Sequence, residues 1–593
     1  MHHQVEPIDR PYKLPFRKHF DFFKQMWRKK RSKPQAQTNN DQDTPGEMIQ
    51  KFEYNFKQLQ FNLTGNDLIL SHGFSKEQDG FKLCYFQAPS SCCGDIPTEP
   101  CLFRLNQRIY CTIQFFCHQK ILHSGSPLKL YFSGICGTAT ASLAILMKNR
   151  GHQVRGSDEN IYPPMSLLLM ENQIDVAAGF HQSNLHPRPD LVIIGNALSR
   201  GNPEVEAVLS KKIPYISASE LLKQHFIKDR RSLVVSGTHG KTTTTSLLAW
   251  VFECAGLQPG FMIGGVAENF GSGCRDKEGE FFITEGDEYD TAFFDKRSKF
   301  LHYLPEQLIL NNLEFDHADI FDTLEDIEYS FRMLLRLVPE DGRIVANGDD
   351  PAVMRVLEHS FSPITLFGKS NHCDLCLSGH RLEKGGTYFT AIQKDHPEKS
   401  FFLALHGEHN VFNALGVLAL ARHNGIEDEI TSNAFASFRS VKRRMELRGQ
   451  SSDILVYDDF AHHPTAVAET LKTAKGLFPE QRLIAVFEPR SNTSVQNLMQ
   501  SMLEEALSLA DRVLMAKPHR GESIPVKKRL DEGTLTNNLK RHGVTTTIHQ
   551  NSDGILQTLV EECKPGDVVV IMSNGSFGNL HQRLLQALEL LKK

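Results

Sequence analysis

Short apolar runs alternate with stretches of helical spacing from about residue 128 to the end of the chain. Most of the runs are about four to five residues long, as buried strands are, and turn-forming or polar residues follow them. This alternation predicts parallel α/β sheets, in which ligands bind beyond the carboxyl ends of the strands. The runs that we expect to be strands lie at residues 128–132, 190–196, 213–217, 232–236, 280–284, 308–310, 454–457, 483–487, 512–515 and 568–571.

The pattern divides the chain into an N-terminal segment and three α/β units. Its 593 residues correspond to three to five domains on the usual scale of about 100–200 residues each. We expect residues 1–127 to be an extension that is poorly ordered or accessory. The three units then cover residues 128–231, 232–440 and 441–593.

The first unit has the order strand, glycine turn, helix, strand and acid. The first strand ends in Ser133-Gly134-Ile135-Cys136-Gly137, and the second ends in Gly156-Ser157-Asp158. Such a turn brings backbone N–H groups at a helix start close to a diphosphate. The spacing is G-x-x-G rather than G-x-G-x-x-G, so a diphosphate site and a plain tight turn both remain open.

The strongest motif of the chain opens the second unit. The strand at 232–236 is followed by Gly237-Thr238-His239-Gly240-Lys241-Thr242-Thr243 and a helix predicted over Ser246–Cys254. Loop N–H groups would cradle phosphate, Lys241 would reach the β- and γ-phosphates, and the Thr242 hydroxyl would bind Mg²⁺. A strict P-loop has glycine where this chain has Val235, but the Gly-Lys-Thr core at a helix start remains.

Two further strands of this unit end in clusters of hard oxygen ligands, which suit Mg²⁺. Residues 285–290 supply four acids, and residues 311–317 supply two asparagines, two acids and a histidine. Later, Asn410 and Asn413 stand at the start of an apolar helix at 411–422. They could cap that helix or contact a base, and their spacing favours the cap.

Composition narrows the function classes. The 66 Lys and Arg nearly balance the 70 Asp and Glu, for a net charge of -4, which argues against a dedicated nucleic-acid binder. No apolar run is long enough to span a membrane.

Residues 10–33 hold ten Lys and Arg; a solvated basic tail is favoured there over an amphipathic anchor or a targeting peptide. The absence of a secretory signal and of a paired-cysteine framework predicts a reducing cytoplasm.

Five dispersed motifs together resemble the Mur ligases, ATP-dependent amide-forming enzymes of the peptidoglycan pathway. The resemblance covers about residues 128–593 and rests on residues 237–243, 285–288, 312–317, 409–410 and 458–464. It implies a Rossmann-like UDP-binding N-terminal domain, a P-loop-type central ATPase domain and a Rossmann-like C-terminal domain that binds the amine substrate.

Longer strings are similar to the branch of the family that recycles cell-wall tripeptide. They lie at residues 134–138, 162–165, 194–197, 293–299, 488–493, 572–575 and 577–578. This similarity implies joining of L-alanyl-γ-D-glutamyl-meso-diaminopimelate to UDP-N-acetylmuramate through an acyl phosphate, with ATP and Mg²⁺. The alternatives are a ligase that adds L-alanine to the same sugar nucleotide, and a non-catalytic nucleotide switch.

The resemblance also implies roles for individual residues. The implied catalytic residues are Lys241, His239, Glu285 and His317, and the implied metal ligands are Thr242, Glu285 and His317. ATP would be bound by Gly237, Thr238, His239, Gly240, Lys241, Thr242, Thr243, Asn410, Asn413, Arg444 and Asp459. The UDP-sugar would be bound by Gly134, Ile135, Cys136, Gly137, Ser157, Asp158 and Asn196, and the peptide by His462, His463, Arg490, Ser491 and Asn492.

One family feature is absent from the sequence. Several Mur ligases carry a carbamylated lysine on the helix after the motif histidine, where it supports a second Mg²⁺. This chain has no lysine between Lys299 and Lys369, and Arg332 or Arg336 occupies that helix. A second metal held through a carbamate is therefore not expected, while one bound directly by side chains remains open.

Overall fold

The computed structural model describes residues 59–64, 67–72, 84–86 and 127–590, except 163–164, 395 and 519–523. The chain divides into two compact units, Met1–Phe116 and Cys117–Lys593. In the first unit, three strands form an antiparallel sheet: β1 (Leu59–Thr64), β2 (Asp67–His72) and β3 (Cys84–Phe86). The basic tail predicted over residues 10–33 lies outside the described residues.

The second unit contains a five-stranded parallel sheet with the order β6-β5-β4-β7-β8. From β4 the chain adds β5 and β6 towards one edge of the sheet, and then β7 and β8 towards the other edge. The position between β4 and β7 is therefore a topological switch point, where ligands bind in such sheets. The loops after these two strands are close, because a Cβ on Gly134 would lie 3.7 Å from the Gly195 Cα. The strands are β4 (Lys129–Ser133), β5 (Gln153–Asp158), β6 (Asp175–Ala178), β7 (Leu191–Ile194) and β8 (Tyr215–Ser217). The helices are α4 (Thr138–Asn149), α5 (Met165–Glu171), α6 (Pro203–Ser210) and α7 (Ala218–Leu222).

A ten-stranded sheet follows, with the order β11-β10-β12-β9-β15-β16-β17-β18-β19-β20. It is parallel from β10 to β18, and antiparallel strands extend both edges. Its strands are β9 (Arg231–Ser236), β10 (Gly260–Ala267), β11 (Ser272–Arg275), β12 (Phe281–Gly286), β15 (Gln307–Leu310), β16 (Arg343–Asn347), β17 (Ile364–Gly368), β18 (Leu375–Glu383), β19 (Gly386–Gln393) and β20 (Lys399–Leu403). Helices α8 (Lys241–Cys254), α9 (Leu324–Leu335), α10 (Pro351–Leu357), α11 (Glu408–His423) and α12 (Asp428–Ser437) belong to this part, and β13 (Asp290–Ala292) pairs with β14 (Asp295–Ser298).

Helix α8 begins five residues earlier than the apolar pattern predicts, at Lys241 rather than Ser246. The polar residues of its first turns hide the helix in the sequence, yet Thr243, Thr244 and Thr245 are buried. Gly240 precedes the helix with φ of 80°, a conformation that glycine adopts without strain. The Gly-Lys-Thr core therefore lies directly at the start of a helix that packs into the core of the sheet.

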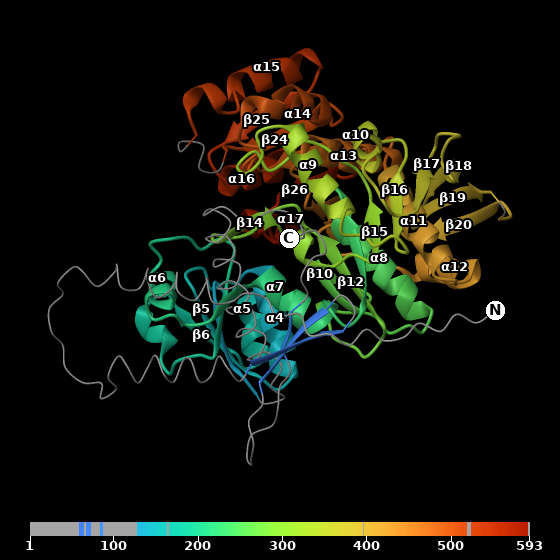
Figure 1. Ribbon diagram of the computed structural model, residues 1–593. Helices are drawn as coiled ribbons and strands as arrows, with labels where there is room; N and C mark the ends of the chain where they lie inside the picture. Colours follow the sequence, from blue (N-terminus) through green and yellow to red (C-terminus); the bar gives the residue numbers. More distant parts are fainter. Residues whose placement is uncertain are drawn as a thin grey trace. The chain divides into compact units, whose positions relative to one another are not determined.

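The third sheet has six strands in the order β21-β22-β26-β23-β24-β25, parallel except for the edge strand β21. The strands are β21 (Glu446–Ser451), β22 (Ile454–Asp459), β23 (Leu483–Phe487), β24 (Arg512–Ala516), β25 (Thr545–His549) and β26 (Val568–Met572). The helices are α13 (Pro464–Leu477), α14 (Gln500–Leu507), α15 (Glu532–Arg541), α16 (Ser552–Glu562) and α17 (Leu580–Leu590). The elements of the three sheets can be followed by colour in Figure 1, cyan for the first, green to orange for the second and red for the third.

In the part of the chain that the structure describes, no helix combines the length and apolarity needed to cross a membrane.

Candidate active site

The loop between β9 and α8 has the geometry of a phosphate cradle. Gly237 has φ of 132° and Gly240 has φ of 80°. The Asn312 carbonyl accepts a hydrogen bond from the Thr238 N–H at 3.0 Å, and the Asn312 side chain accepts one from the His239 N–H at 2.7 Å. The first backbone bond of α8 runs from Thr244 to Gly240, so the N–H groups of Lys241, Thr242 and Thr243 are available to an anion.

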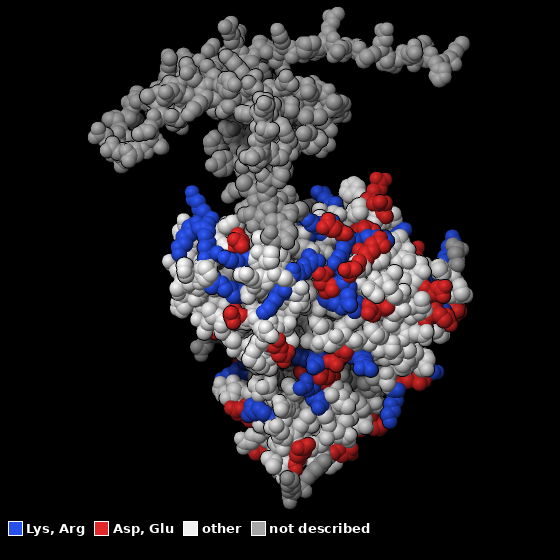
Figure 2. Space-filling model, turned by 90° about the horizontal axis from the view of Figure 1, so that it is seen from below, with Lys and Arg blue, Asp and Glu red and all other residues white. Residues whose placement is uncertain are grey.

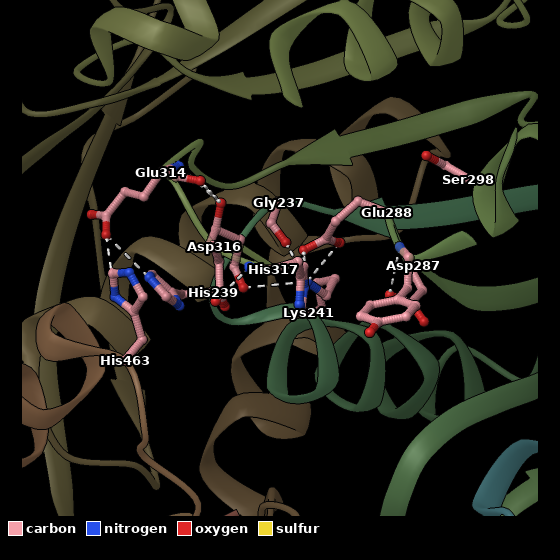
Figure 3. Close-up of polar contacts among 12 residues, drawn as sticks. Gly237, His239, Lys241, Asp287, Glu288, Ser298, Glu314, Asp316, His317 and His463 are labelled. Carbon is pink, nitrogen blue, oxygen red and sulfur yellow. Dashed lines mark hydrogen bonds and ion pairs between the residues drawn. The ribbon is translucent and has the colours of Figure 1, made fainter. Parts of the chain in front are cut away.

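Lys241 is held inside this loop by a carboxylate that sequence reasoning did not select. Its ammonium group donates to both oxygens of Glu288 at 2.9 Å and to the Gly237 carbonyl at 2.7 Å (Figure 3). Glu288 also lies 3.1 Å from Nε2 of His317. Burial lowers the pKa of Lys241, but the neighbouring carboxylates, with Glu288 the strongest, leave it above its usual value. Burial likewise lowers the pKa of His317, whereas its contact with Glu288 raises it overall.

Two of the three expected metal ligands, Thr242 and Glu285, contact each other, whereas the third, His317, does not join them. The Thr242 hydroxyl donates to Oε2 of Glu285 at 3.0 Å, and Glu285 also accepts from the Gly264 N–H. Burial raises the pKa of Glu285, although these hydrogen bonds oppose it. His317 contacts Glu288 instead of Glu285. Glu288 adds a second carboxylate to this set and lies three residues after Glu285 in the same predicted acidic cluster.

A second cluster joins the central and C-terminal sheets through Glu314. Its carboxylate lies 3.2 Å from Nε2 of His239 and 3.5 Å from Nδ1 of His463, as Figure 3 shows, and accepts from the Thr465 hydroxyl at 2.6 Å. These two histidines and Glu314 form a set close enough to hold a metal ion, which the sequence spacing did not suggest. Nδ1 of His463, however, accepts from the Thr465 N–H at 3.3 Å, so hydrogen bonds already use the facing lone pair.

His463 should make the contact between the two sheets sensitive to acid. Burial lowers its pKa to about 4, so the folded protein holds the ring neutral while the unfolded chain takes up a proton below its ordinary pKa of 6.5. Its contribution to stability is therefore complete above pH 6.5 and is lost as the pH falls towards 4. The loss at pH 4 should be on the order of 3 kcal/mol.

This acid sensitivity can be measured as the melting temperature from pH 7 to 4. We expect a clearly smaller decline in His463→Asn, because asparagine can still cap α13 but does not titrate. Equal declines in the two proteins would contradict this role of His463. The pKa of Glu314 is lowered to about 2 because its hydrogen bonds outweigh burial, so its stabilising contribution is complete above pH 4.5 and is lost only as the pH falls below that value.

A cavity of about 980 Å³ lies between the phosphate loop and residues of the third sheet. Of the residues expected to bind ATP, it is lined by Thr238, His239, Gly240, Lys241, Thr242, Thr243, Asn410, Asn413, Arg444 and Asp459. Neither asparagine caps α11, because its N-cap is Gly407; the cap prediction was therefore wrong. Asn413 instead packs under the phosphate loop, where a Cβ on Gly240 would come within 2.5 Å of its Oδ1.

Arg444 and Asp459 have different environments in this cavity. The Arg444 guanidinium lies 5.2 Å from the centre of the Phe460 ring. Asp459 is 5% exposed, and its carboxylate accepts from the backbone N–H groups of Met445 and Ala461, both at 2.7 Å. Arg444 is thus oriented by an aromatic ring, while Asp459 fixes the backbone beside it.

The residues expected to bind peptide fall into two groups. His462 and His463 line the cavity, whereas Arg490, Ser491 and Asn492 are not among its lining residues. Burial lowers the pKa of His462, whose ring contacts the Phe460 carbonyl. The loop at 490–492 is nevertheless tied to the central sheet, because the adjacent Thr493 donates to Asp316 at 2.7 Å.

The residues expected to bind the UDP-sugar gather at the carboxyl ends of β4, β5 and β7. The N–H groups of Gly134 and Ile135 donate to the Ser157 carbonyl, and the Cys136 N–H donates to Asp158 at 2.9 Å. Gly137 precedes α4, and Asn196 follows β7 after Gly195. The Ser157 hydroxyl is directed into the core rather than towards the loop surface.

Acidic and basic side chains are mixed on the face of the molecule drawn in Figure 2. Among the described residues no patch of a single sign covers that face, in keeping with a formal net charge of -4.

Comparison with known proteins places these sheets in a family. Residues 129–230 match the Mur ligase family catalytic domain, residues 235–421 the Mur ligase middle domain and residues 443–575 the Mur ligase glutamate ligase domain. UDP-N-acetylmuramate–L-alanyl-gamma-D-glutamyl-meso-2,6-diaminoheptandioate ligase of Escherichia coli (strain K12) is 42% identical over 463 residues, which cover 78% of this chain and 98% of the relative. This chain belongs to the Mur ligase family.

Two further Mur ligases differ in how similar their sequences are to this chain. The crystal structure of a murein peptide ligase from Psychrobacter arcticus 273-4 is 36% identical and covers 78% of this chain and 99% of its own, with a TM-score of 0.61. UDP-N-acetylmuramate–L-alanine ligase of Psychrobacter sp. (strain PRwf-1) is 29% identical, covering 77% of this chain and 94% of its own. The sequence identity of this chain to these murein peptide ligases is thus higher than its identity to this L-alanine ligase.

As a Mur ligase, the protein is an ATP-dependent enzyme that forms amide bonds. The three-domain α/β architecture expected from the motifs is confirmed by the matched domains and the three sheets. The nucleotide switch without ligase activity is therefore set aside.

Proposed function

We propose that this Mur ligase joins L-alanyl-γ-D-glutamyl-meso-diaminopimelate to UDP-N-acetylmuramate in peptidoglycan recycling. The observation that carries the proposal is 42% identity to the E. coli ligase named for these substrates, over 98% of that relative. The sugar's lactyl carboxylate would attack the γ-phosphate of ATP, which breaks the β,γ-phosphoanhydride bond, forms an acyl phosphate and releases ADP. The tripeptide amine would then displace phosphate and form the amide.

The arrangement around Lys241 supports the first of these steps. A carboxylate and a polyphosphate must approach one another, so positive charge near the reacting oxygens lowers the barrier. Lys241 is a cation at the start of α8 whose side chain is 16% exposed, and it lies beside N–H groups that precede the first helical hydrogen bond. In this proposal Lys241 faces the γ-phosphate and His239 steadies the acyl phosphate.

Residues fit for Mg²⁺ lie beside Lys241. A nucleotide-bound divalent ion takes oxygen donors and an occasional imidazole nitrogen. These donors are offered here by the Thr242 hydroxyl, the Glu285 and Glu288 carboxylates and the His317 imidazole. Bound there, Mg²⁺ would neutralise the charge that develops on the phosphate oxygens. Arg332, on α9, forms an ion pair with Glu328 at 3.6 Å, so a second ion would depend on side chains other than a carbamylated lysine.

The remaining substrate sites are proposed from the ends of the outer sheets. We assign residues 128–231 to the UDP-sugar, 232–440 to ATP and 441–593 to the tripeptide. Arg490 has the planar, forked geometry that suits a peptide carboxylate.

A cytoplasmic location is proposed because the six described cysteines are free thiols, as in a reducing compartment.

A comparison of amine substrates tests the proposed reaction. With ATP, Mg²⁺ and UDP-N-acetylmuramate held saturating, we expect kcat/KM for the tripeptide to exceed that for L-alanine by at least about 100-fold. Contacts to the two additional residues would supply this difference, since every 1.4 kcal/mol of transition-state binding gives about a factor of ten. Phosphate release and mass spectrometry of the product would report turnover.

The dipeptide L-alanyl-γ-D-glutamate serves as a control because it presents the same amine without the terminal residue. Turnover with L-alanine alone would assign the enzyme to the alanine-adding reaction instead. Turnover with none of the three amines would refute ligation to this sugar nucleotide.

A further inference from the structure

Glu204 is a fully buried carboxylate beneath the loop after β4. It is the second residue of α6 and is 0% exposed. Its five described hydrogen-bond partners are hydroxyl or amide groups. A carboxylate buried without an adjacent cation is costly unless several donors satisfy it, so its surroundings must be closely organised.

The five partners come from three segments: β4, β5 and the connection that follows β6. Oε1 accepts from the Tyr131 hydroxyl and the Asn184 amide, both at 2.8 Å, and from the His181 N–H at 3.4 Å. Oε2 accepts from the hydroxyls of Ser157, at 2.7 Å, and Ser133. Burial raises the pKa of Tyr131, as does the Glu204 carboxylate, so this hydroxyl keeps its proton and can donate it.

Two of these partners continue into the loop expected to receive the diphosphate. The Ser157 carbonyl accepts from the N–H groups of Gly134 at 2.9 Å and Ile135 at 3.0 Å. The Ser133 carbonyl accepts from the Gly195 N–H at 2.8 Å. Glu204 therefore fixes, through the two serines, both loops at the switch point of the sheet.

We propose that Glu204 is a positioning residue of the UDP-sugar site, which keeps the loop at 134–137 in the shape that binds a nucleoside diphosphate. The proposal rests on the proposed function, which places UDP-N-acetylmuramate at this loop. Glu204 does not touch the substrate and acts only through Ser133 and Ser157. This role also explains why the Ser157 hydroxyl points away from the loop surface.

Glu204→Gln tests this role because it keeps the shape but replaces an accepting oxygen with an NH₂ group that faces hydroxyl donors. Glu206→Gln is a matched control, since Glu206 is on the same helix but forms an exposed ion pair with Arg200 at 2.9 Å. Calorimetric titration with UDP-N-acetylmuramate, without ATP, gives the affinity. Steady-state kinetics gives kcat and the KM of each substrate, and thermal unfolding gives the melting temperature.

In Glu204→Gln we expect Kd and KM for UDP-N-acetylmuramate to rise about tenfold or more, while kcat and the KM for ATP stay within about twofold. Glu206→Gln should resemble the parent. A lower melting temperature with unchanged Kd and KM would show a merely structural role and overturn the proposal. Failure of the parent itself to bind UDP-N-acetylmuramate would instead refute the proposed function.

A second variant keeps the test decisive if Glu204→Gln does not fold. Ser157→Ala removes one donor to Glu204 and retains the carbonyl that holds Gly134 and Ile135. It should raise KM for the sugar nucleotide selectively, by less than Glu204→Gln would. An unchanged KM in a folded Ser157→Ala protein would overturn the proposal.

Discussion

Lys241→Met is expected to lower the rate of ligation by at least about 100-fold, because it removes the largely buried cation that we propose to face the γ-phosphate of ATP. The substitution also removes the lysine partner of Glu288, which is 2% exposed, and leaves this carboxylate with only its contact to His317. Breaking such a buried pair costs about 3–5 kcal/mol of stability. The single variant should therefore lose both activity and stability, measured by phosphate release and by thermal unfolding.

The double variant Lys241→Met/Glu288→Gln separates these two effects. Removing the unpaired charge should recover most of the lost stability without restoring ligation. Lys384→Met, in the exposed turn between β18 and β19, controls for loss of a lysine elsewhere. A double variant that ligates at the parental rate would contradict the role assigned to Lys241.

Gly237→Ala should weaken ATP binding by at least about tenfold. A Cβ at this position would lie 2.9 Å from the Asn312 carbonyl oxygen and 3.0 Å from its nitrogen, and φ of 132° is unfavourable for alanine. The loop would have to withdraw, which would break the hydrogen bonds of Thr238 and His239 to Asn312. Nucleotide affinity, measured by titration calorimetry, reports the displacement.

Gly385→Ala provides the matched control. Gly385 also has a positive φ, of 103°, but a Cβ there would have no neighbour within 4 Å. The two variants share the backbone strain of about 1–3 kcal/mol and differ in the contact with Asn312. Equal nucleotide affinities in the two variants would show that the close approach to Asn312 does not shape the loop.

The parts of the site that follow one another in sequence were predictable. The expected phosphate loop is contiguous, and its Gly-Lys-Thr core lies at the start of α8 even though Val235 stands where a strict P-loop has a glycine. The strands that carry the acids were also visible as short apolar runs. The start of α8 was not, because the four consecutive threonines after Lys241 disguise a buried helix as a polar loop.

Contacts that depend on tertiary arrangement could not be predicted. Glu285, Asp287 and Glu288 follow the same strand, and the sequence does not indicate which of them pairs with Lys241. The contact of Glu314 with Thr465 joins residues 151 positions apart, one in the loop after β15 and the other in α13. The buried environment of Glu204 was equally hidden, because its partners come from separate strand ends and loops.

The ion pair between Lys241 and Glu288 has a thermodynamic consequence for substrate binding. Lys241 already has a counterion, so a phosphate group that binds it must displace the Glu288 carboxylate. The free energy of phosphate binding is therefore less favourable than it would be at an unpaired lysine. The exchange releases Glu288 next to His317, where its oxygens could accept a divalent ion. Nucleotide and metal binding would then be linked, each increasing the affinity for the other by the same factor.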